Sequence, residues 1–220
     1  MKSKIAFMVC TVLCFLSVPV FADVYMFWGG NYSNTVTTKA DDTANHAVGI
    51  NYTVLFDWGK FRGLYLGIGL NYDFTDYKLP DSAKKLGISN YKQTFISLPL
   101  RVGYPFIFDL SDNSRLLLIP SLALDFTFLG ASFSSGSSDF DISGYGEQVG
   151  LSLNVGMKHK LNKMYLRYGV DFDLPFLIAM NLTLKSSKYS SVRYTDGVFD
   201  TISDYVALTT SPYVCLGFKL

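Results

Sequence analysis

The sequence predicts an all-β protein, an eight-stranded antiparallel transmembrane β-barrel with short periplasmic turns and four long extracellular loops. The first observation is a period of two in the stretch RLLLIPSLALDFTF at 115–128, where six Leu and Phe residues share one parity and Asp125 has the other. A helix would place Asp125 among the leucines, whereas a strand separates them onto two faces. The stretch is also long enough for the roughly 9 to 11 tilted residues that cross a bilayer.

Composition is the second observation. The chain of 220 residues is 49% hydrophobic and 16% aromatic but only 17% charged, which is a small charged share for a soluble protein. The hydrophobic residues are dispersed over short alternating pieces, as in an outer-membrane β-barrel. A soluble sandwich or lipocalin-like barrel is the alternative, but it would carry Lys, Glu and Thr where this sequence has glycine and small polar residues.

The third observation is the number and spacing of the alternating segments. Short links at 57–62, 109–114 and 161–163 alternate with long polar links at 35–45, 75–91, 129–145 and 185–204. This alternation predicts long loops outside the cell, short turns in the periplasm and both mature ends inside. The eight predicted strands are 24–34, 46–56, 63–74, 92–108, 115–128, 146–160, 164–184 and 205–220.

Residues 1–22 have the pattern of a secretory signal peptide. Lys2 and Lys4 precede an apolar run that is too short to span a membrane, and small residues follow it at a cleavage-like site. We therefore expect a mature barrel domain at 23–220, exported to the cell outer membrane. Its 17 basic and 18 acidic residues give no basic field for nucleic acid. Cys215 is the single mature cysteine, so no internal disulfide forms.

Parity predicts which face of each strand meets the membrane lipid. Apolar rows recur within 48–56, 64–72, 96–104, 149–157 and 170–176, and aromatic residues gather near both strand ends, as the interfacial girdles of a barrel do. Glycine is disfavoured in strands unless space is needed, and an eight-stranded barrel has a narrow interior. We therefore place inward the parity that holds Gly49, Gly67, Gly69, Gly103, Gly150, Gly156, Gly169 and Gly217.

Five ionisable residues share this inward parity and form the candidate site. In a packed interior they need partners, so we expect the two arginines to pair with the three aspartates. The cluster is either a structural ion-pair network that rigidifies a small barrel or a polar constriction that gates it. Its members are Arg101, Asp125, Arg167, Asp171 and Asp173.

Four prolines fall well inside the predicted strands, namely Pro99, Pro120, Pro175 and Pro212. Each removes a ladder hydrogen bond, and lipid offers no replacement. They mark either bulges and strand ends or local interruptions of the barrel wall.

At this point the sequence resembles the small outer-membrane barrels typified by OmpW, OmpX and the membrane domain of OmpA. The resemblance covers the mature chain and rests on the architecture and on ISLPLRVGY at 96–104, a strand with proline after an apolar run. It implies that the C-terminal strand, SPYVCLGFKL, is recognised by the barrel-assembly machinery. Leu220 stands where these families usually have a terminal aromatic residue, and Phe218 lies two residues earlier.

Two classes of function fit this interpretation. One is a narrow conduit or lateral-exit pore for small, possibly hydrophobic, molecules, which the in-strand prolines favour. The other is a surface-exposed structural or adhesion protein that binds a host ligand through its loops. We expect no enzymatic activity, cofactor or metal, because the two histidines, His46 and His159, lie at opposite barrel ends and cannot share a site.

Overall fold

The computed structural model describes residues 22–37, 45–58, 63–73, 87–135, 138–186, 192–196 and 207–220. The predicted signal peptide and most of three long loops lie outside these residues. No helix in the described part of the chain is long and apolar enough to span a membrane. The strands are β1 (Asp23–Thr37), β2 (Asn45–Asp57), β3 (Gly63–Asp73), β4 (Ile88–Gly103), β5 (Phe106–Ser111), β6 (Ser114–Ser135), β7 (Ser138–Leu161), β8 (Met164–Ser186), β9 (Val192–Asp196) and β10 (Ala207–Lys219).

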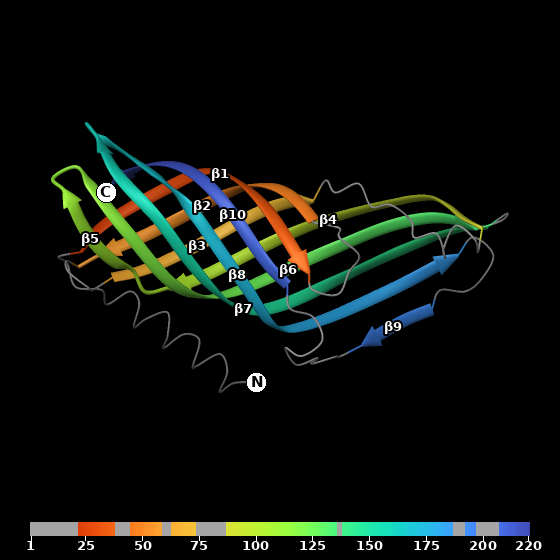
Figure 1. Ribbon diagram of the computed structural model, residues 1–220. Coiled ribbons are helices and arrows are strands. Elements are labelled where there is room, and N and C mark those ends of the chain that lie inside the picture. The colour runs from red at the N-terminus through yellow and green to blue at the C-terminus, as the bar shows by residue number, and fades with distance from the viewer. Residues whose placement is uncertain are drawn as a thin grey trace.

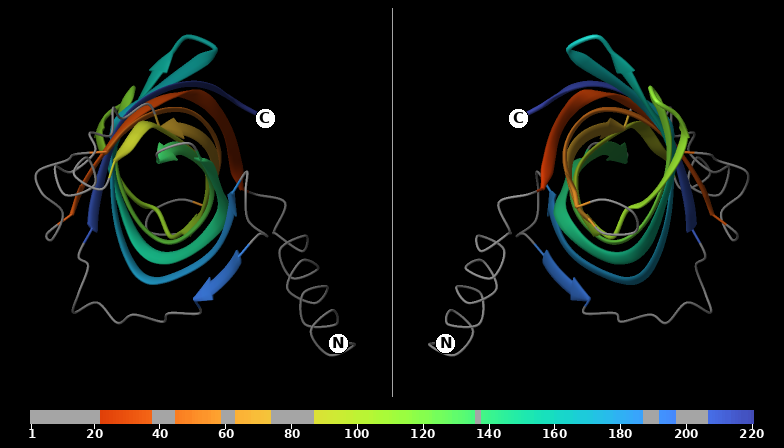
Figure 2. Two further views of the ribbon diagram at one scale, coloured as in Figure 1. Left: turned by 90° about the vertical axis from the view of Figure 1, so that its right-hand side faces the viewer. Right: turned by 90° about the vertical axis from the view of Figure 1, so that its left-hand side faces the viewer.

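Eight of these strands close into an antiparallel ring in the order β10-β1-β2-β3-β4-β6-β7-β8, and β8 pairs with β10 to complete it. The end-on views of Figure 2 show the closed barrel. The other two strands lie off the ring, because β5 pairs with the start of β6 and β9 pairs with the far end of β8. The predicted eight-stranded antiparallel barrel is confirmed.

Side chains alternate between the lumen and the outer face, as parity predicts. On β6, Leu117 and Ile119 are fully buried in the lumen, whereas Leu122 is 47% exposed on the outside. Residues on the outer face of the other strands are also large and apolar, among them Ile50, Leu70 and Leu151. An exposed apolar band around a closed ring is the surface that contacts lipid in an outer-membrane barrel.

The two ends of the barrel differ. At one end tight turns join β5 to β6 and β7 to β8, and Asn162 adopts a left-handed backbone (φ 56°) in the second turn, a conformation that Asn tolerates better than most residues. The start of β1 and the C-terminus meet there, where the Leu220 backbone N–H donates to the Val24 carbonyl at 2.9 Å. Figure 1 shows the C-terminus at this end, which is the periplasmic end.

The barrel wall is much taller on one side than on the other. The strands β6, β7 and β8 contain 22, 24 and 23 residues, whereas β3 contains 11, and Figure 1 shows the long strands projecting past the short ones at the outer end. The prediction of a loop at 129–145 is therefore wrong, because most of this segment belongs to β6 and β7. Strand pairing continues to Ser135 and Ser138, and the stacked rings of Phe133 and Phe140, 5.0 Å apart, support the extended hairpin.

Two further predicted segments differ in detail. The loop predicted at 185–204 contains the short strand β9. The strand predicted at 92–108 is divided into β4 and β5 at Tyr104 and Pro105, because proline has no N–H for the ladder. The Tyr104 N–H donates to the Pro120 carbonyl at 3.0 Å across this break, so the wall remains connected there.

Candidate functional site: the lumen and its outer vestibule

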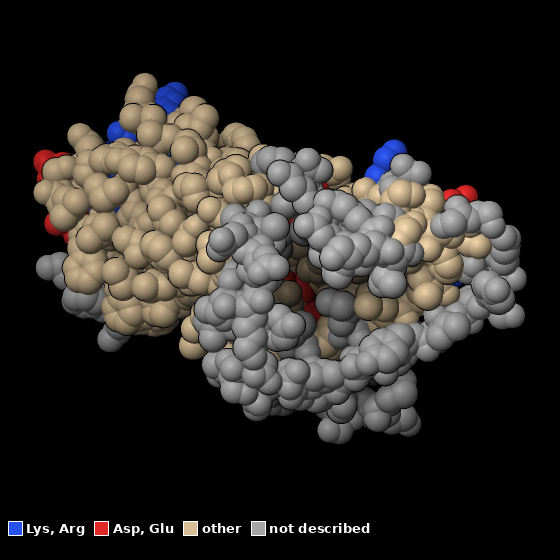
Figure 3. Space-filling view, turned by 45° about the vertical axis from the view of Figure 1, so that its right-hand side comes forward, with Lys and Arg blue, Asp and Glu red and all other residues tan. Residues whose placement is uncertain are grey.

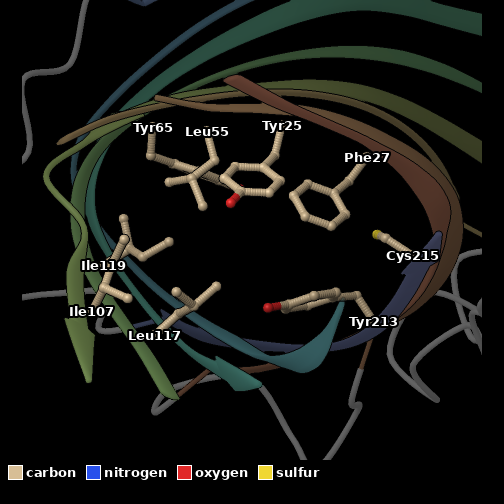
Figure 4. Close-up of a cluster of buried hydrophobic side chains, with 9 residues drawn as sticks. All are labelled: Tyr25, Phe27, Leu55, Tyr65, Ile107, Leu117, Ile119, Tyr213 and Cys215. Carbon is tan, nitrogen blue, oxygen red and sulfur yellow. The ribbon is translucent and has the colours of Figure 1, made fainter. Parts of the chain in front are cut away.

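Aromatic and aliphatic side chains fill the periplasmic half of the lumen. Figure 4 shows that they project from opposite walls toward one another. Phe27, Leu55 and Leu117 are completely inaccessible to solvent. An eight-stranded barrel is only wide enough for side chains to fill, so these residues close the bore. The cluster, called the apolar plug below, consists of Tyr25, Phe27, Leu55, Tyr65, Ile107, Leu117, Ile119, Tyr213 and Cys215.

A small charged group lies beside the apolar plug at the periplasmic end. The Arg115 guanidinium contacts Asp57 at 2.9 Å and Asp109 at 2.7 Å. The buried Lys158 ammonium lies 3.7 Å from Asp57 and 3.6 Å from the centroid of the Tyr25 ring, where the ring face attracts it. This group was not predicted from the sequence pattern. Lys158 could have been found, because it shares the parity of Gly150 and Gly156, but Asp57 was assigned to a turn.

Arg167 lies in the middle of the lumen, where it is 1% exposed. Its guanidinium donates to Thr53 Oγ1 and to Asn154 Oδ1, both at 3.0 Å. The guanidinium carbon also lies 4.9 Å from the Tyr65 ring centroid and 5.0 Å from that of Tyr213. No salt bridge to an aspartate is formed among the described residues. Aromatic faces and neutral oxygen atoms surround this cation instead of the carboxylate that we expected.

The next layer holds the ion pairs. Arg101 Nη2 and Nε donate to the two carboxylate oxygens of Asp173 at 2.6 and 3.2 Å, a bidentate geometry that strengthens the pair. Arg101 Nη1 lies 3.7 Å from Asp171, which also accepts from Asn154 Nδ2 at 2.7 Å. Asn154 thus links the ion pairs to Arg167. Arg101, Asp171 and Asp173 are each at most 9% exposed.

Asp125 is separate from this network. Its carboxylate forms neither a hydrogen bond nor a salt bridge with any residue in the described part of the chain. On either side its inward-facing ladder neighbours are Pro99 and Gln148, and neither carries positive charge. The structure therefore brings together Arg101, Asp171 and Asp173 and leaves Asp125 facing open space.

That space is a cavity of about 470 Å³ in the outer half of the lumen, called the vestibule below. Arg101, Asp125 and Asp173 lie in its lining, and Figure 3 shows acidic atoms inside the hollow at this end of the barrel. The remaining lining is mixed. Hydroxyl and amide side chains include Ser33, Asn71, Ser97, Thr127, Gln148, Thr209 and Ser211, and apolar ones include Phe95, Pro99, Leu129, Pro175 and Leu182.

Pro99 and Pro212 lie at skipped positions within the ladder of two adjacent strands. Between β3 and β4 the pairing passes from Ile68–Leu100 directly to Asn71–Ser97, and Pro99 lies in the gap. Between β1 and β10 it passes from Asn31–Tyr213 to Asn34–Thr210, and Pro212 lies in the gap. The register is the same on both sides of each gap, so the strands stay adjacent and lose only hydrogen bonds.

The other two prolines lie at irregular places of a different kind. Pro120 faces outward opposite the break between β4 and β5, where its carbonyl accepts from Tyr104. Pro175 lies at a β-bulge, because the register of β7 with β8 shifts between Val149 and Gly150. At Pro120 the pairing passes from Gly103–Ser121 to Phe106–Leu118 in unchanged register, and the Tyr104–Pro120 hydrogen bond bridges the skipped pairs.

The two skipped positions are held together differently. At the β1–β10 gap, Ser33 and Ser211 hydroxyls are hydrogen-bonded at 2.9 Å, and those of Thr35 and Thr209 at 2.8 Å. The β3–β4 gap, called the β3–β4 seam below, has no such links, because its four residues, Gly69, Leu70, Leu98 and Pro99, carry no polar side-chain atom. A Cβ added to Gly69 would lie 2.9 Å from the Pro99 ring. The seam is therefore closed by van der Waals contact.

The two histidines lie at opposite ends of the barrel, and neither lines the vestibule. His46 is hydrogen-bonded to Tyr32 near the start of β2, and His159 to Ser114 and Tyr168 near the periplasmic turn of β7. Within the described ranges, no group of three or more His, Cys, Asp or Glu residues could hold a metal ion.

No family model matches the sequence, and no curated protein sequence matches it. Solved structures do match. A major outer membrane protein from Thermus thermophilus superposes with a TM-score of 0.53 at 13% identity, over 89% of this chain and 99% of that chain. Ail, the attachment invasion locus protein of Yersinia pestis, gives 0.48 at 10% identity, over 90% and 99%. Neisserial surface protein A gives 0.45 at 10% identity, over 90% and 97%.

At these identities the likeness is one of fold. Together with the closed ring and its apolar outer face, it defines the class of this chain. The chain is an integral β-barrel protein of the small, eight-stranded kind found in the bacterial outer membrane.

Proposed function

We propose that this protein takes small hydrophobic or amphipathic molecules from outside the cell into the vestibule and releases them sideways into the membrane through the β3–β4 seam. The observation that carries the proposal is the position of Pro99. This residue lines the vestibule and also lies in the skipped part of the β3–β4 ladder. Pro99 is therefore part of both the vestibule lining and the β3–β4 seam, so the two adjoin each other.

The lateral route is favoured over a straight conduit because of the apolar plug. Its nine residues fill the bore below the vestibule, and the Arg101–Asp173 pair lies across the floor. A solute moving toward the periplasm would have to displace buried side chains and separate a buried ion pair, which costs several kcal/mol. Opening the seam separates only apolar contacts, and each strand keeps its other ladder.

A disulfide across the seam tests the route. Leu70 and Leu98 are opposite each other in the unchanged register of β3 and β4, so L70C and L98C, in a C215A background, should form a reversible staple. Uptake of N-phenyl-1-naphthylamine, which fluoresces in apolar surroundings, would be followed in cells that produce the protein. We expect the oxidised staple to slow uptake and a reducing agent to restore it.

The matched control staples the same two strands where the ladder is intact, with L66C and V102C. This staple should leave uptake unchanged. Equal uptake with the L70C–L98C staple oxidised and reduced would contradict the lateral route. The refolded wild-type barrel should also show no steady conductance in a planar bilayer, because the plug blocks the bore. A stable open conductance would favour a conduit instead.

Binding of a host ligand at the cell surface is a second candidate function, and the tall wall favours it. The hairpin of β6 and β7 continues past Phe128 and Tyr145, and its outward face there carries Ser132, Asp139 and Asp141 in place of apolar residues. Such a hairpin stands in water above the membrane. Replacing 130–143 by a two-residue turn should abolish adhesion to host cells and leave uptake of the probe intact if this function is the correct one.

A further inference from the structure

We infer that the vestibule binds small molecules that carry a protonated amine on an apolar body. The inference rests on the vestibule being the receiving site of the proposed function, although binding itself does not require lateral release. It is carried by the charges of the lining, by the absence of an ion pair at Asp125 among the described residues and by the mixture of polar and apolar side chains in the lining.

The charges of the lumen cluster do not balance. Arg101 and Arg167 supply two positive charges against the three carboxylates of Asp125, Asp171 and Asp173. Arg101 is engaged by Asp173 and Asp171, and Arg167 by Thr53, Asn154 and aromatic rings. The excess negative charge is that of Asp125, which lines the cavity and forms no salt bridge among the described residues. Asp73 adds a further carboxylate to the lining.

The cation next to Asp125 on the sheet is Arg101, which lies diagonally across the β4–β6 ladder opposite Ala123, but Asp173 and Asp171 already engage its guanidinium. Across the ladder it faces Pro99, which has no N–H, and Gln148, and its inward-facing neighbours on β6 are Ala123 and Thr127. A half-buried carboxylate without a charged partner is costly. A ligand ammonium beside Asp125 would supply a charge-assisted hydrogen bond, whereas an anionic ligand would be repelled by the same carboxylates.

The apolar part of the lining fits the rest of such a ligand. Phe95, Leu129, Leu182 and the rings of Pro99 and Pro175 line the same cavity as Asp125. A volume of about 470 Å³ lies within the range of small-molecule sites and holds a single small ligand. The Asp125 carboxylate and these apolar side chains would together orient an amphipathic cation, with its ammonium at Asp125 and its body against the apolar residues.

Equilibrium binding of three probes that differ only in their polar group tests the inference. Phenethylammonium, phenethyl alcohol and 3-phenylpropanoate would be titrated into the mature barrel in nanodiscs of zwitterionic lipid, with binding followed by NMR or calorimetry. We expect the ammonium to bind most tightly and the carboxylate most weakly. Asp125→Asn should weaken binding of the ammonium about tenfold or more and leave the alcohol unchanged.

Asp141→Asn is the matched control, because Asp141 is exposed on the outward face of β7 and should not affect any probe. Equal affinities for ammonium and alcohol, or an Asp125→Asn variant with unchanged ammonium binding, would overturn the inference. Failure here is distinguishable from failure of the lateral route. If the ammonium probe binds selectively but the L70C–L98C staple has no effect on uptake, the binding site is supported and the lateral route is rejected.

Discussion

The inward positions of β1 and β6 carry large side chains in the periplasmic half of the lumen, and mostly smaller or polar ones in the outer half. On β1, Tyr25 and Phe27 are followed by Asn31 and Ser33, and β6 changes in the same direction from Leu117 to Thr127. The ring has eight strands along its whole membrane-spanning length, so its bore changes little. Whether each half is closed or hollow is therefore set by side-chain volume.

The largest contrast should appear in access to a water-soluble maleimide. Cys215 and Thr209 both face the lumen on β10, but Cys215 is 2% exposed in the apolar plug and Thr209 lines the vestibule. We expect Cys215 to stay unlabelled until the barrel is unfolded. In a C215A background, T209C should be labelled readily in the folded protein. Rapid labelling of Cys215 would show that the periplasmic half is open to water.

Removing the Arg101 guanidinium should have the largest effect on stability. Arg101→Ala leaves Asp171 and Asp173 buried without their cation, which should lower the free energy of unfolding by about 4 kcal/mol. Urea unfolding of the refolded barrel in lipid vesicles measures this. Lys163→Ala, in an exposed turn, serves as the control and should stay within about 0.5 kcal/mol. A loss below that of the control would mean that the ion pairs contribute nothing.

Truncating a leucine should lower stability by different amounts in the two halves of the lumen, and β6 allows both to be measured on one strand. Leu117→Ala opens a cavity in the apolar plug and should cost about 3 kcal/mol. Leu129→Ala, on the same face of β6 but in the vestibule lining, removes contacts from a space that is already hollow, and it should cost below about 1 kcal/mol. Equal losses in the same urea experiment would mean that the outer half is packed as well.

Asp125→Ala should give the smallest change. Because the carboxylate has no hydrogen bond or salt bridge within the part of the chain that is described, its removal leaves no group without a partner, and stability should fall by no more than about 0.5 kcal/mol. Asp171→Ala removes one of the two carboxylates that balance buried Arg101, together with the acceptor of Asn154 Nδ2, and should cost about 3 kcal/mol. A comparable loss in both variants would place Asp125 inside the ion-pair network, as the sequence pattern alone suggested.

Much of the barrel could be predicted from local pattern. Parity gives the strand faces, because neighbouring side chains point to opposite sides whatever the tertiary structure. The extended hairpin at 129–145 was missed for a physical reason. Above the membrane its outward face meets water, so the alternation of apolar and polar residues disappears, and Ser, Gly and Asp are equally typical of loops.

The partners within the lumen could not be predicted from parity. Arg101 on β4 meets Asp173 on β8 across the bore, and that match depends on the stagger of strands that are not neighbours in the sheet. The same stagger places Arg167 among Tyr65, Tyr213 and Asn154 rather than beside a carboxylate. The pattern identifies which residues face inward, and the closed ring decides which of them touch.

The height of Pro99 in the wall determines which leaflet would receive a released molecule. Pro99 is paired with Asp125, three residues from Phe128, where the apolar outward row of β6 ends. The β3–β4 seam therefore lies at the level of the outer leaflet, and a molecule released there would still have the inner half of the roughly 30 Å hydrocarbon layer to cross. A permanently charged cation would stop there. An amine that releases its proton on leaving Asp125 could permeate the remaining leaflet unaided, so the barrel would select for weak bases.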